Sequence, residues 1–438
     1  MNNHVLLRLA IAALALLLPV AAFAGGAQEQ TAEEEPIVTF FANSKYYSDN
    51  TTITRNEAFE AQTGIKVEMQ LVPGEDIEFY DKTDIAIMGG DTTDCIRLTN
   101  PINIARYVDA GFLMQLDGIL AEIGYDAEAV YGKFLKRYDG RLLYLPYEQS
   151  IHSVYFNEAI FDSAGVAYPK SPWTWEDYVA TAKKLVDKPN GVYGSYFVNW
   201  PYYYYMLARQ RDISAYTEDG YSNYDHPAFK ESLKFMNDLG SVHKVQPTYL
   251  EYQAKKMQWD TWAATGKYGM ICIGSWFTGL LTDPVTYPRD WDWGIVETPA
   301  AGPNGKNNLM AGGVWSILKN AKHPKNAARY IAWVSENSYK YAGGIPARVN
   351  LTPQEVQDLL GGIAEKSSGS VTVQELNAAL LANTLGVVDE KISGPRVREY
   401  SDIIEQEGQL YLSGEQSLED TIRVIKERAD KVLAENKT

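Results

Sequence analysis

The chain has 438 residues, of which 45% are hydrophobic, so we expect two or three folded domains with sizeable cores rather than a disordered chain. Lys and Arg number 40 against 56 Asp and Glu, and the net charge of -16 disfavours a nucleic-acid partner and a bulk anionic membrane surface. A neutral small-molecule ligand is compatible with this charge.

The N-terminus predicts a secretory signal peptide. An apolar run over 9–18 is followed by Ala22-Phe23-Ala24, which has the small residues of a cleavage site. The run is shorter than the roughly 20 residues of a membrane span, which disfavours the alternative of a retained anchor. We expect residues 1–24 to be removed and the acidic segment 25–35 to be a flexible leader. No cysteine lies near the cleavage point, so we predict a soluble periplasmic protein without a lipid anchor or a membrane-spanning segment.

The elements that follow alternate as they do in an α/β domain. Residues 36–41 and 65–69 are rich in β-formers and predict strands on either side of a helix over 51–63. Residues 83–88 predict a third strand that leads into a glycine pair. Alternating strands and helices favour a mostly parallel sheet.

Later elements are predicted by capping residues and by apolar residues at helical spacing. They are helices that begin at Thr174–Asp177 and Ser417–Asp420, helices over 227–239 and 324–334, and a strand over 268–273. The Ser/Gly-rich stretch 361–369 predicts a loop. No Pro-rich linker divides the chain, so two lobes would have to be joined by several short connections.

The chain lacks the common motifs of metal, nucleotide and hydrolase sites. It has 2 cysteines and 5 histidines, with no H-E-x-x-H helix, no G-x-x-x-x-G-K-[ST] loop, no G-x-G-x-x-G loop that begins a helix and no G-x-S-x-G turn. We therefore expect no metal, no cofactor and no catalytic residue.

Eight short motifs follow one another between residues 36 and 435. The first four are Phe59-Glu-Ala-Gln-Thr-Gly-Ile-Lys-Val67, Gly89-Gly-Asp-Thr-Thr-Asp-Cys-Ile96, Tyr107-Val-Asp-Ala-Gly-Phe-Leu-Met-Gln-Leu-Asp117 and Asp139-Gly-Arg-Leu-Leu-Tyr-Leu-Pro146. The others are Val154-Tyr-Phe-Asn157 with Phe161-Asp-Ser-Ala-Gly165 and Pro172-Trp-Thr-Trp175, then Gly266–Trp276, Gly312-Gly313 with His323–Ala328, and Gly344-Ile-Pro-Ala-Arg348. In this order they resemble the extracellular solute-binding proteins of ABC importers, in particular the family that binds sugars and oligosaccharides. One departure is Thr93, where that family usually has proline.

The resemblance implies the class II, two-lobe periplasmic binding protein fold, in which two α/β lobes enclose a ligand cleft and are joined by three crossover segments. The implied crossovers lie near 147–150, 298–303 and 344–348. The implied lobes are 36–147 plus 300–345 for lobe 1 and 148–299 plus 346–438 for lobe 2. Cys95 and Cys272 would then lie in different lobes, and we expect two buried free thiols.

A sugar presents hydroxyls around its rim and apolar C–H faces, so its site needs flat rings and convergent polar groups. The 30 Tyr and 10 Trp residues suit that chemistry, although Tyr-rich surfaces without a ligand are the alternative. By resemblance, the first two ligand loops supply Asn43, Ser44, Lys45 and Tyr46, and then Asp94, Thr99 and Asn100. The second loop departs from the best-known maltodextrin binders, which have an aromatic residue and an acid there, and Asp94 has a structural role as its alternative.

The resemblance places the stacking rings in lobe 2, at Trp276 after Gly274-Ser275 and at Trp200, Tyr202 and Tyr203. Four successive tyrosines, 202–205, cannot all face one way. The other candidate lining residues are Tyr147, Glu148, Gly312, Gly313, Trp315 and Arg348. Core, hinge or ion-pair roles are the alternatives for these six residues.

The leading hypothesis is a monomeric protein that binds a sugar or oligosaccharide by hinge closure and delivers it to ABC permease subunits, without catalysis. A secreted carbohydrate hydrolase is the second hypothesis, because two carboxylates across a glycosidic bond would suffice for it. The third keeps the fold but binds a non-sugar solute such as a glycerol phosphate or a peptide. A phosphate would need more arginine than the implied cleft provides.

Overall fold

The computed structural model describes residues 35–44, 50–74, 76–99, 101–285, 287–301, 308–342, 344–382 and 386–435. Residues 36–438 form one compact unit. The predicted signal peptide and nearly all of the predicted leader lie outside the described residues.

The first part of the sheet has the strand order β2 (Lys66–Val72), β1 (Ile37–Asn43), β3 (Cys95–Leu98), β8 (Asn308–Ile317) and β4 (Leu145–Asn157). β1 runs parallel to β2 and β3, whereas β8 runs antiparallel to β3 and β4. Successive residues of a strand point to opposite faces, and Phe40 and Phe41 accordingly enter two different hydrophobic clusters. Both faces of this part are therefore covered.

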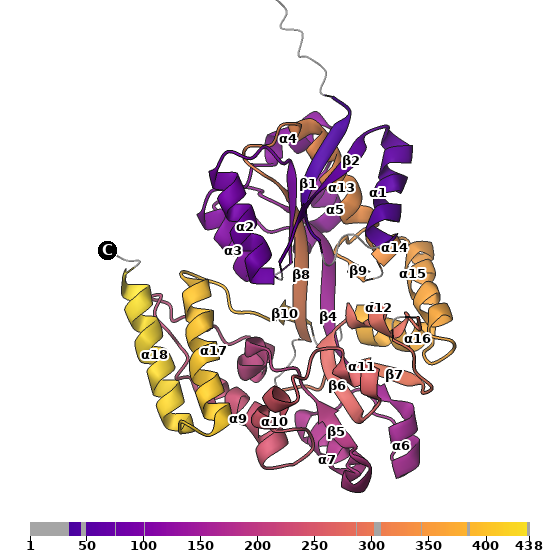
Figure 1. Cartoon of the computed structure of the whole chain (residues 1–438), viewed down its shortest axis with the longest axis vertical. Helices are drawn as coiled ribbons and strands as arrows, with labels where there is room; N and C mark the ends of the chain where they lie inside the picture. Colours follow the sequence, from indigo (N-terminus) through magenta and orange to yellow (C-terminus); the bar gives the residue numbers. More distant parts are fainter. Residues whose placement is uncertain are drawn as a thin grey trace, which may run out of the picture. The chain divides into compact units, whose positions relative to one another are not determined.

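Two pairs of helices cover these faces. Helices α1 (Asn50–Thr63) and α13 (Pro324–Asn337) lie on one side of the sheet, and α2 (Asp76–Met88) and α3 (Pro101–Asp109) lie on the other (Figure 1). The first pair packs in the cluster of Phe40 and the second pair in the cluster of Phe41. We call this part of the chain the first lobe.

β4 passes from the first lobe into the second. Its residues up to Ile151 pair with β8, and the residues from His152 onward pair with β6 (Tyr268–Gly274) and β7 (Trp293–Glu297). β5 (Tyr193–Tyr196) adds to β6 in parallel. Two short strands return to this junction, β9 (Ile345–Pro346) beside β4 and β10 (Val387–Asp389) beside β8.

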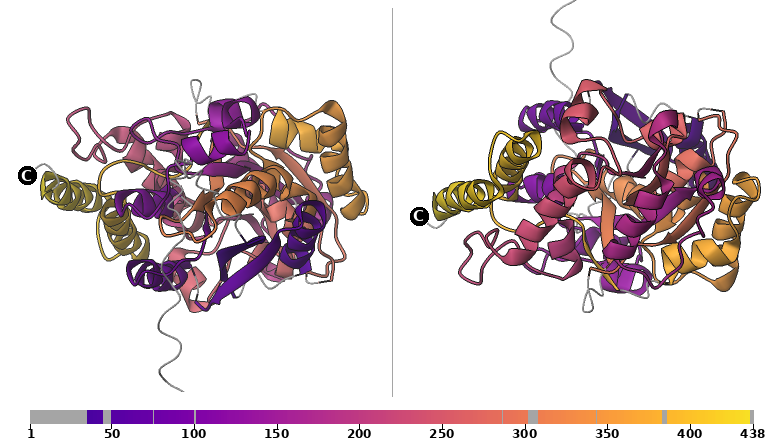
Figure 2. Two further views of the ribbon diagram at one scale, coloured as in Figure 1. Left: turned by 90° about the horizontal axis from the view of Figure 1, so that it is seen from above. Right: turned by 90° about the horizontal axis from the view of Figure 1, so that it is seen from below.

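The second lobe is mostly helical outside its sheet. Helices α17 (Val397–Ser413) and α18 (Leu418–Glu435) pack side by side at one edge, away from α15 (Pro353–Lys366) (Figure 2). The other long helices of this lobe are α7 (Trp175–Leu185) and α9 (Pro227–Ser241).

The shorter helices are α4 (Asp117–Glu122), α5 (Ala127–Tyr131), α6 (Glu158–Ala164), α8 (Met206–Gln210), α10 (Tyr249–Ala254), α11 (Thr261–Thr265), α12 (Phe277–Leu281), α14 (Tyr339–Ala342) and α16 (Val373–Leu376). Four helical turns complete the described elements: η1 (Gly132–Phe134), η2 (Lys188–Asn190), η3 (Pro201–Tyr205) and η4 (Asn377–Leu381). Two of these short elements border the candidate site described below, since Trp200 precedes η3 and Trp276 precedes α12.

Most predicted elements are confirmed, including β1, α1, β2, β6, α7, α9, α13 and α18. The predicted capping box of α7 is complete, because Thr174 and Asp177 bind each other's backbone N–H. The fold class is confirmed as α/β. Both cysteines are buried free thiols, Cys95 in β3 and Cys272 in β6, as expected.

The predicted strand over 83–88 is wrong, since these residues end helix α2. Phe79, Tyr80, Thr83 and Ile87 are buried at helical spacing, whereas Ile85 and Met88 are 68% and 67% exposed. The six residues 83–88 taken alone resemble a strand. The helical spacing of the apolar residues becomes visible only over the whole of 76–88.

The predicted loop at 361–369 is also largely wrong. Helix α15 begins at a capping box between Thr352 and Glu355 and continues to Lys366. Leu359, Leu360 and Ile363 are buried, and this packing outweighs the low helix propensity of the two glycines within the helix.

Candidate functional site

A cluster of rings in the second lobe forms the first component of the site. We define the aromatic wall as Trp200, Tyr202, Trp259 and Trp276. The Trp276 ring lies 5.4 Å from that of Trp259 and 6.2 Å from that of Trp200, and Trp200 lies 5.8 Å from Tyr202. The three tryptophans are partly exposed, whereas Tyr202 is buried. Partly exposed rings at these spacings leave apolar faces that a flat ligand can cover.

Local structure positions these rings. Trp276 follows β6 after one residue, Ser275, and the buried Phe277 begins α12. Trp200 precedes Pro201, which is the first residue of the turn η3. Because Tyr202, Tyr203, Tyr204 and Tyr205 are all buried in this turn, Trp200 is held at its edge.

Tyr203 belongs to the core of the second lobe rather than to the wall surface. Its side chain is 1% exposed, its hydroxyl donates to the Cys272 carbonyl at 2.6 Å, and its ring packs on Phe197. We therefore remove Tyr203 from the candidate ligand-binding residues. Tyr202 stays at the inner end of the wall, with the Lys391 ammonium 5.8 Å from its ring centre.

A serine hydroxyl lies near the Trp276 indole. A Cβ atom built on Gly274 would lie 2.4 Å from Ser150 Oγ and 2.9 Å from Trp276 Nε1, so the serine and the indole border the same point. Ser150 Oγ and Ser275 Oγ are buried and have no hydrogen-bond partner among the described residues. Buried hydroxyls usually have partners. Sequence reasoning passed over both serines because a serine carries no positional signal of its own.

Beside the wall, His152 and Glu390 form a buried pair. His152 Nε2 lies 2.8 Å from Glu390 Oε2, and the His152 ring lies 5.6 Å from that of Tyr202. Burial raises the pKa of Glu390, but the Lys391 charge and the His152 hydrogen bond outweigh it and hold that pKa below its usual value. This pair joins β4 to the segment after β10. No local pattern predicts it, because the partners are 238 residues apart in the chain.

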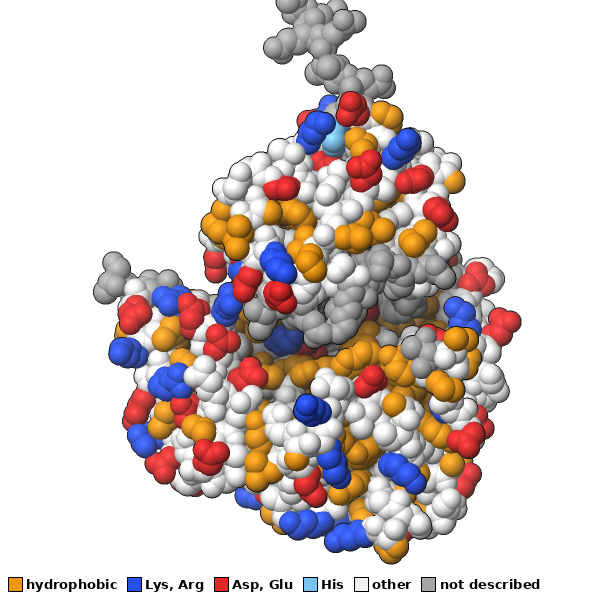
Figure 3. All heavy atoms as spheres, in the orientation of Figure 1, with side chains coloured by type: hydrophobic (Ala, Val, Ile, Leu, Met, Phe, Trp, Pro, Cys, Tyr) orange, Lys and Arg blue, Asp and Glu red, His pale blue; other side chains and the backbone are white. Residues whose placement is uncertain are grey.

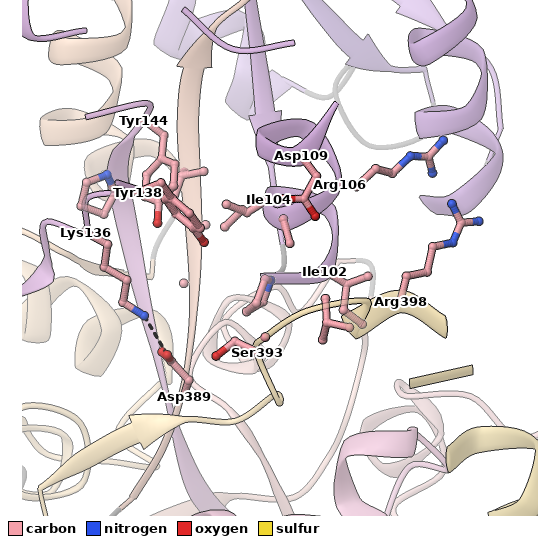
Figure 4. Close-up of a pocket in the computed structure, with 18 of the residues that line it drawn as sticks. Ile102, Ile104, Arg106, Asp109, Lys136, Tyr138, Tyr144, Asp389, Ser393 and Arg398 are labelled. Carbon is pink, nitrogen blue, oxygen red and sulfur yellow. Dashed lines mark hydrogen bonds and ion pairs between the residues drawn. The ribbon is translucent and has the colours of Figure 1, made fainter. Parts of the chain in front are cut away.

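The second component is a cavity of about 990 Å³, which we call the α3–α17 cavity (Figure 4). It lies between α3 of the first lobe and residues 389–399 of the second, and Glu148, Gly312 and Gly313 form part of its lining. In the space-filling view the surface is hollowed between the two lobes, with hydrophobic side chains along its lower rim (Figure 3).

The charged groups of this cavity are mostly paired. Lys136 Nζ lies 2.7 Å from Asp389 Oδ2, so one ion pair joins the two lobes. Arg106 binds Asp81 and Asp84 at 2.7 Å each, and Arg396 binds Glu399 at 2.6 Å.

Two carboxyl groups of the cavity have raised pKa values. Burial raises the pKa of Glu148, despite the opposing charge of Arg97. Burial, together with the Glu399 charge across the cavity, raises the pKa of Asp109. This environment therefore disfavours additional negative charge.

Several predicted lining residues have other roles. Asp94 is wholly buried and accepts hydrogen bonds from the backbone N–H of Thr39 at 2.8 Å and of His323 at 2.6 Å. Trp315 is wholly buried, with its ring 5.3 Å from that of Phe40. We remove both residues from the candidate site. Asp94 holds β1 and the start of α13 together, and Trp315 packs in the core of the first lobe.

The remaining candidates are dispersed. The Asn43 amide donates to the Gly74 carbonyl at 2.7 Å. Tyr147 is buried, and the Arg97 guanidinium lies 5.1 Å from its ring centre. Arg348 forms an ion pair with Glu355 at 2.8 Å, as the alternative to a ligand-binding role predicted.

Two first-lobe candidates lie near strand ends. Ser44 follows β1, where its N–H donates to the Val72 carbonyl, and Thr99 is exposed at the end of β3. Lys45, Tyr46 and Asn100 lie outside the described residues.

Within the described ranges, no helix has the length and apolar character that crossing a bilayer requires. The same described ranges contain no group of three or more His, Cys, Asp or Glu side chains placed to bind a metal ion.

Two α/β lobes that share a sheet, with a ring-lined wall and a cavity at their junction, define a two-lobe solute-binding protein. The chain matches the model of the bacterial extracellular solute-binding protein family over residues 48–341. It therefore belongs to that family, whose members are binding proteins.

Individual relatives are distant in sequence. A Brucella abortus protein named as a binding protein is 23% identical over 297 residues, covering 65% of this chain and 68% of the relative. The sn-glycerol-3-phosphate-binding periplasmic protein UgpB of Agrobacterium fabrum is 24% identical over 349 residues, covering 74% and 76%. An ABC substrate-binding protein of Listeria monocytogenes, solved with cycloalternan, has a TM-score of 0.75 at 19% identity, covering 91% of this chain and 99% of that one.

Proposed function

We propose that the protein binds a sugar or oligosaccharide between its lobes and delivers it to an ABC importer without catalysis. The observation that carries this proposal is the aromatic wall next to the unpartnered Ser150 hydroxyl. Flat rings suit the apolar face of a sugar, and a buried hydroxyl without a partner suits its rim. The cycloalternan bound to the Listeria protein of similar fold supports a carbohydrate ligand.

The proposed lobes are residues 36–147 plus 300–345 and residues 148–299 plus 346–438. In support, the buried core residues of the first lobe fall within 38–147 and 314–334, and most of those of the second fall within 154–296 and 359–433. Four residues depart from these bounds, because they lie within 300–345 but pack in the second core: Ala301, Leu309, Tyr339 and Ile345. Ligand contacts with both lobes would favour the closed state, because a ligand shifts such an equilibrium only through contacts that improve on closure.

We also propose that the protein is exported to the periplasm as a soluble monomer and presents its closed form to permease subunits. Size-exclusion chromatography with light scattering tests the monomer, and pull-down of the permease with and without ligand tests the partner.

Calorimetry of the purified protein against monosaccharides, neutral oligosaccharides and glycerol 3-phosphate tests the proposed ligand class. We expect stoichiometric binding of at least one carbohydrate and no cleavage of a labelled oligosaccharide during the titration. Turnover of that oligosaccharide would favour the hydrolase instead. Binding of glycerol 3-phosphate alone would favour the ligand that the Agrobacterium relative is named for.

A further inference from the structure

The aromatic wall and the α3–α17 cavity are adjacent along the same two segments. On β4, Glu148 lines the cavity, Ser150 borders Trp276, and His152 packs near Tyr202. In the segment that leaves β10, Asp389 lines the cavity and Lys391 lies over the Tyr202 ring. Residues 148 to 152 of a strand span about 13 Å. This distance is longer than one sugar ring.

The volume of the cavity points the same way. At about 990 Å³, it is at the upper end of the range for small-molecule sites, roughly 300–1,000 Å³. A single sugar ring at the aromatic wall would leave the α3–α17 cavity empty. A chain of several sugar rings would occupy both the wall and the cavity.

The charges of the cavity favour a neutral occupant. Lys136 and Arg396 are each paired with an acid that also lines the cavity, and Arg106 is paired with two acids outside the lining. Asp109 and Glu148 lie in surroundings that already raise their pKa values. The fourth cation of the lining, Arg398, is exposed and has no ion pair among the described residues. An anionic ligand would bring a further negative charge toward Asp109 and Glu148, with only this exposed guanidinium left unpaired to offset it.

We infer that the ligand is a neutral oligosaccharide of at least three units, held by the aromatic wall at one end and by the α3–α17 cavity at the other. This inference rests on the proposed function. It adds chain length and charge, which the wall alone does not determine.

The test measures affinity as a function of chain length. The probes are malto-, cello- and arabino-oligosaccharides of one to six units, with oligogalacturonates of the same lengths as anionic counterparts. For the neutral series that binds, we expect the affinity to rise at least tenfold between one and three units and then to level off.

A substitution that fills the cavity separates the two subsites. Ser393 is exposed and lies in the loop that lines the cavity (Figure 4). Ser393→Trp should abolish the rise in affinity with chain length and leave the affinity for the monosaccharide within twofold of wild type. Ser393→Ala, which keeps the cavity open, should retain the gain. Melting temperatures of both variants report whether the fold is intact.

Each other outcome overturns a specific statement. If a monosaccharide binds as tightly as its oligomers, the inference about length is wrong and the proposed function stands. If oligogalacturonates bind more tightly than the neutral series, the inference about charge is wrong. If Ser393→Trp keeps the gain from length, the cavity is not the second subsite. If no carbohydrate of any length binds, the proposed function itself fails.

Discussion

His152 Nε2 lies 2.8 Å from Glu390 Oε2, and both side chains are buried where the two lobes meet. Glu390 follows β10, and its backbone N–H donates to the Met310 carbonyl of β8 at 2.9 Å. The pair therefore ties β4, β8 and the segment after β10 at the junction. Leaving one member of a buried polar pair without its partner is costly.

Glu390→Gln should lower the free energy of unfolding by about 1–3 kcal/mol at pH 7, because the charge that Lys391 and His152 stabilise is removed. Urea denaturation measures this loss. Glu57→Gln on the exposed face of α1 is the control and should stay within about 0.5 kcal/mol. An equal loss in both variants would contradict a special role for Glu390.

The same carboxylate predicts a pH dependence. A group whose pKa is lower in the folded state contributes stability above its unfolded pKa and loses it as the pH falls through the folded value. The pKa of Glu390 is lowered from 4.5, so its contribution should be complete at neutral pH and decline below about pH 4.5. Comparing urea unfolding of wild type and Glu390→Gln between pH 3 and pH 7 measures it. The difference between them should shrink as the pH falls, and a constant difference would refute this account.

Trp276→Ala should weaken carbohydrate binding at least tenfold with the fold intact, because the partly exposed indole joins Trp200 and Trp259 in the wall. Calorimetry gives the affinity and circular dichroism the fold. Trp333→Ala in α13 of the first lobe removes another partly buried indole and is the matched control. Unchanged affinity in Trp276→Ala would remove the wall from the proposed site.

Gly274→Ala should also weaken carbohydrate binding about tenfold or more, because the new methyl group would press on Ser150 Oγ and the Trp276 ring. Gly362→Ala on α15 has open space around it and should be neutral or slightly stabilising. Titration calorimetry and thermal melting separate loss of affinity from loss of stability. Retained affinity would show that the site tolerates a side chain there.

Asp94→Asn should destabilise the protein by about 2–4 kcal/mol, because the carboxylate that accepts the Thr39 and His323 N–H groups loses its charge. The affinity of the folded variant for carbohydrate should stay within twofold, since Asp94 is wholly buried away from the cavity and the wall. A large loss of affinity with normal stability would return Asp94 to the ligand-binding residues.

The candidate site was predictable only in part. Trp276 follows strand β6, which its β-forming residues predict. The resemblance of the motif 266–276 to one family predicts that the Trp276 ring stacks on a sugar. Asp94 and Trp315 carry motifs just as clear, yet they are buried in the first lobe. A motif places a residue on its element, but the packing of other elements decides whether that side chain is exposed.

The sequence by itself determined the α/β class, most helices and strands, and the family, because periodicity, capping and ordered motifs act over short distances along the chain. Only the tertiary structure paired His152 with Glu390 and assembled a cavity from Ile102, Lys136 and Asp389. These residues are far apart in the chain. They meet because β4 and β8 cross between the lobes, and the free energy of burying two separate cores brings their loops to one junction.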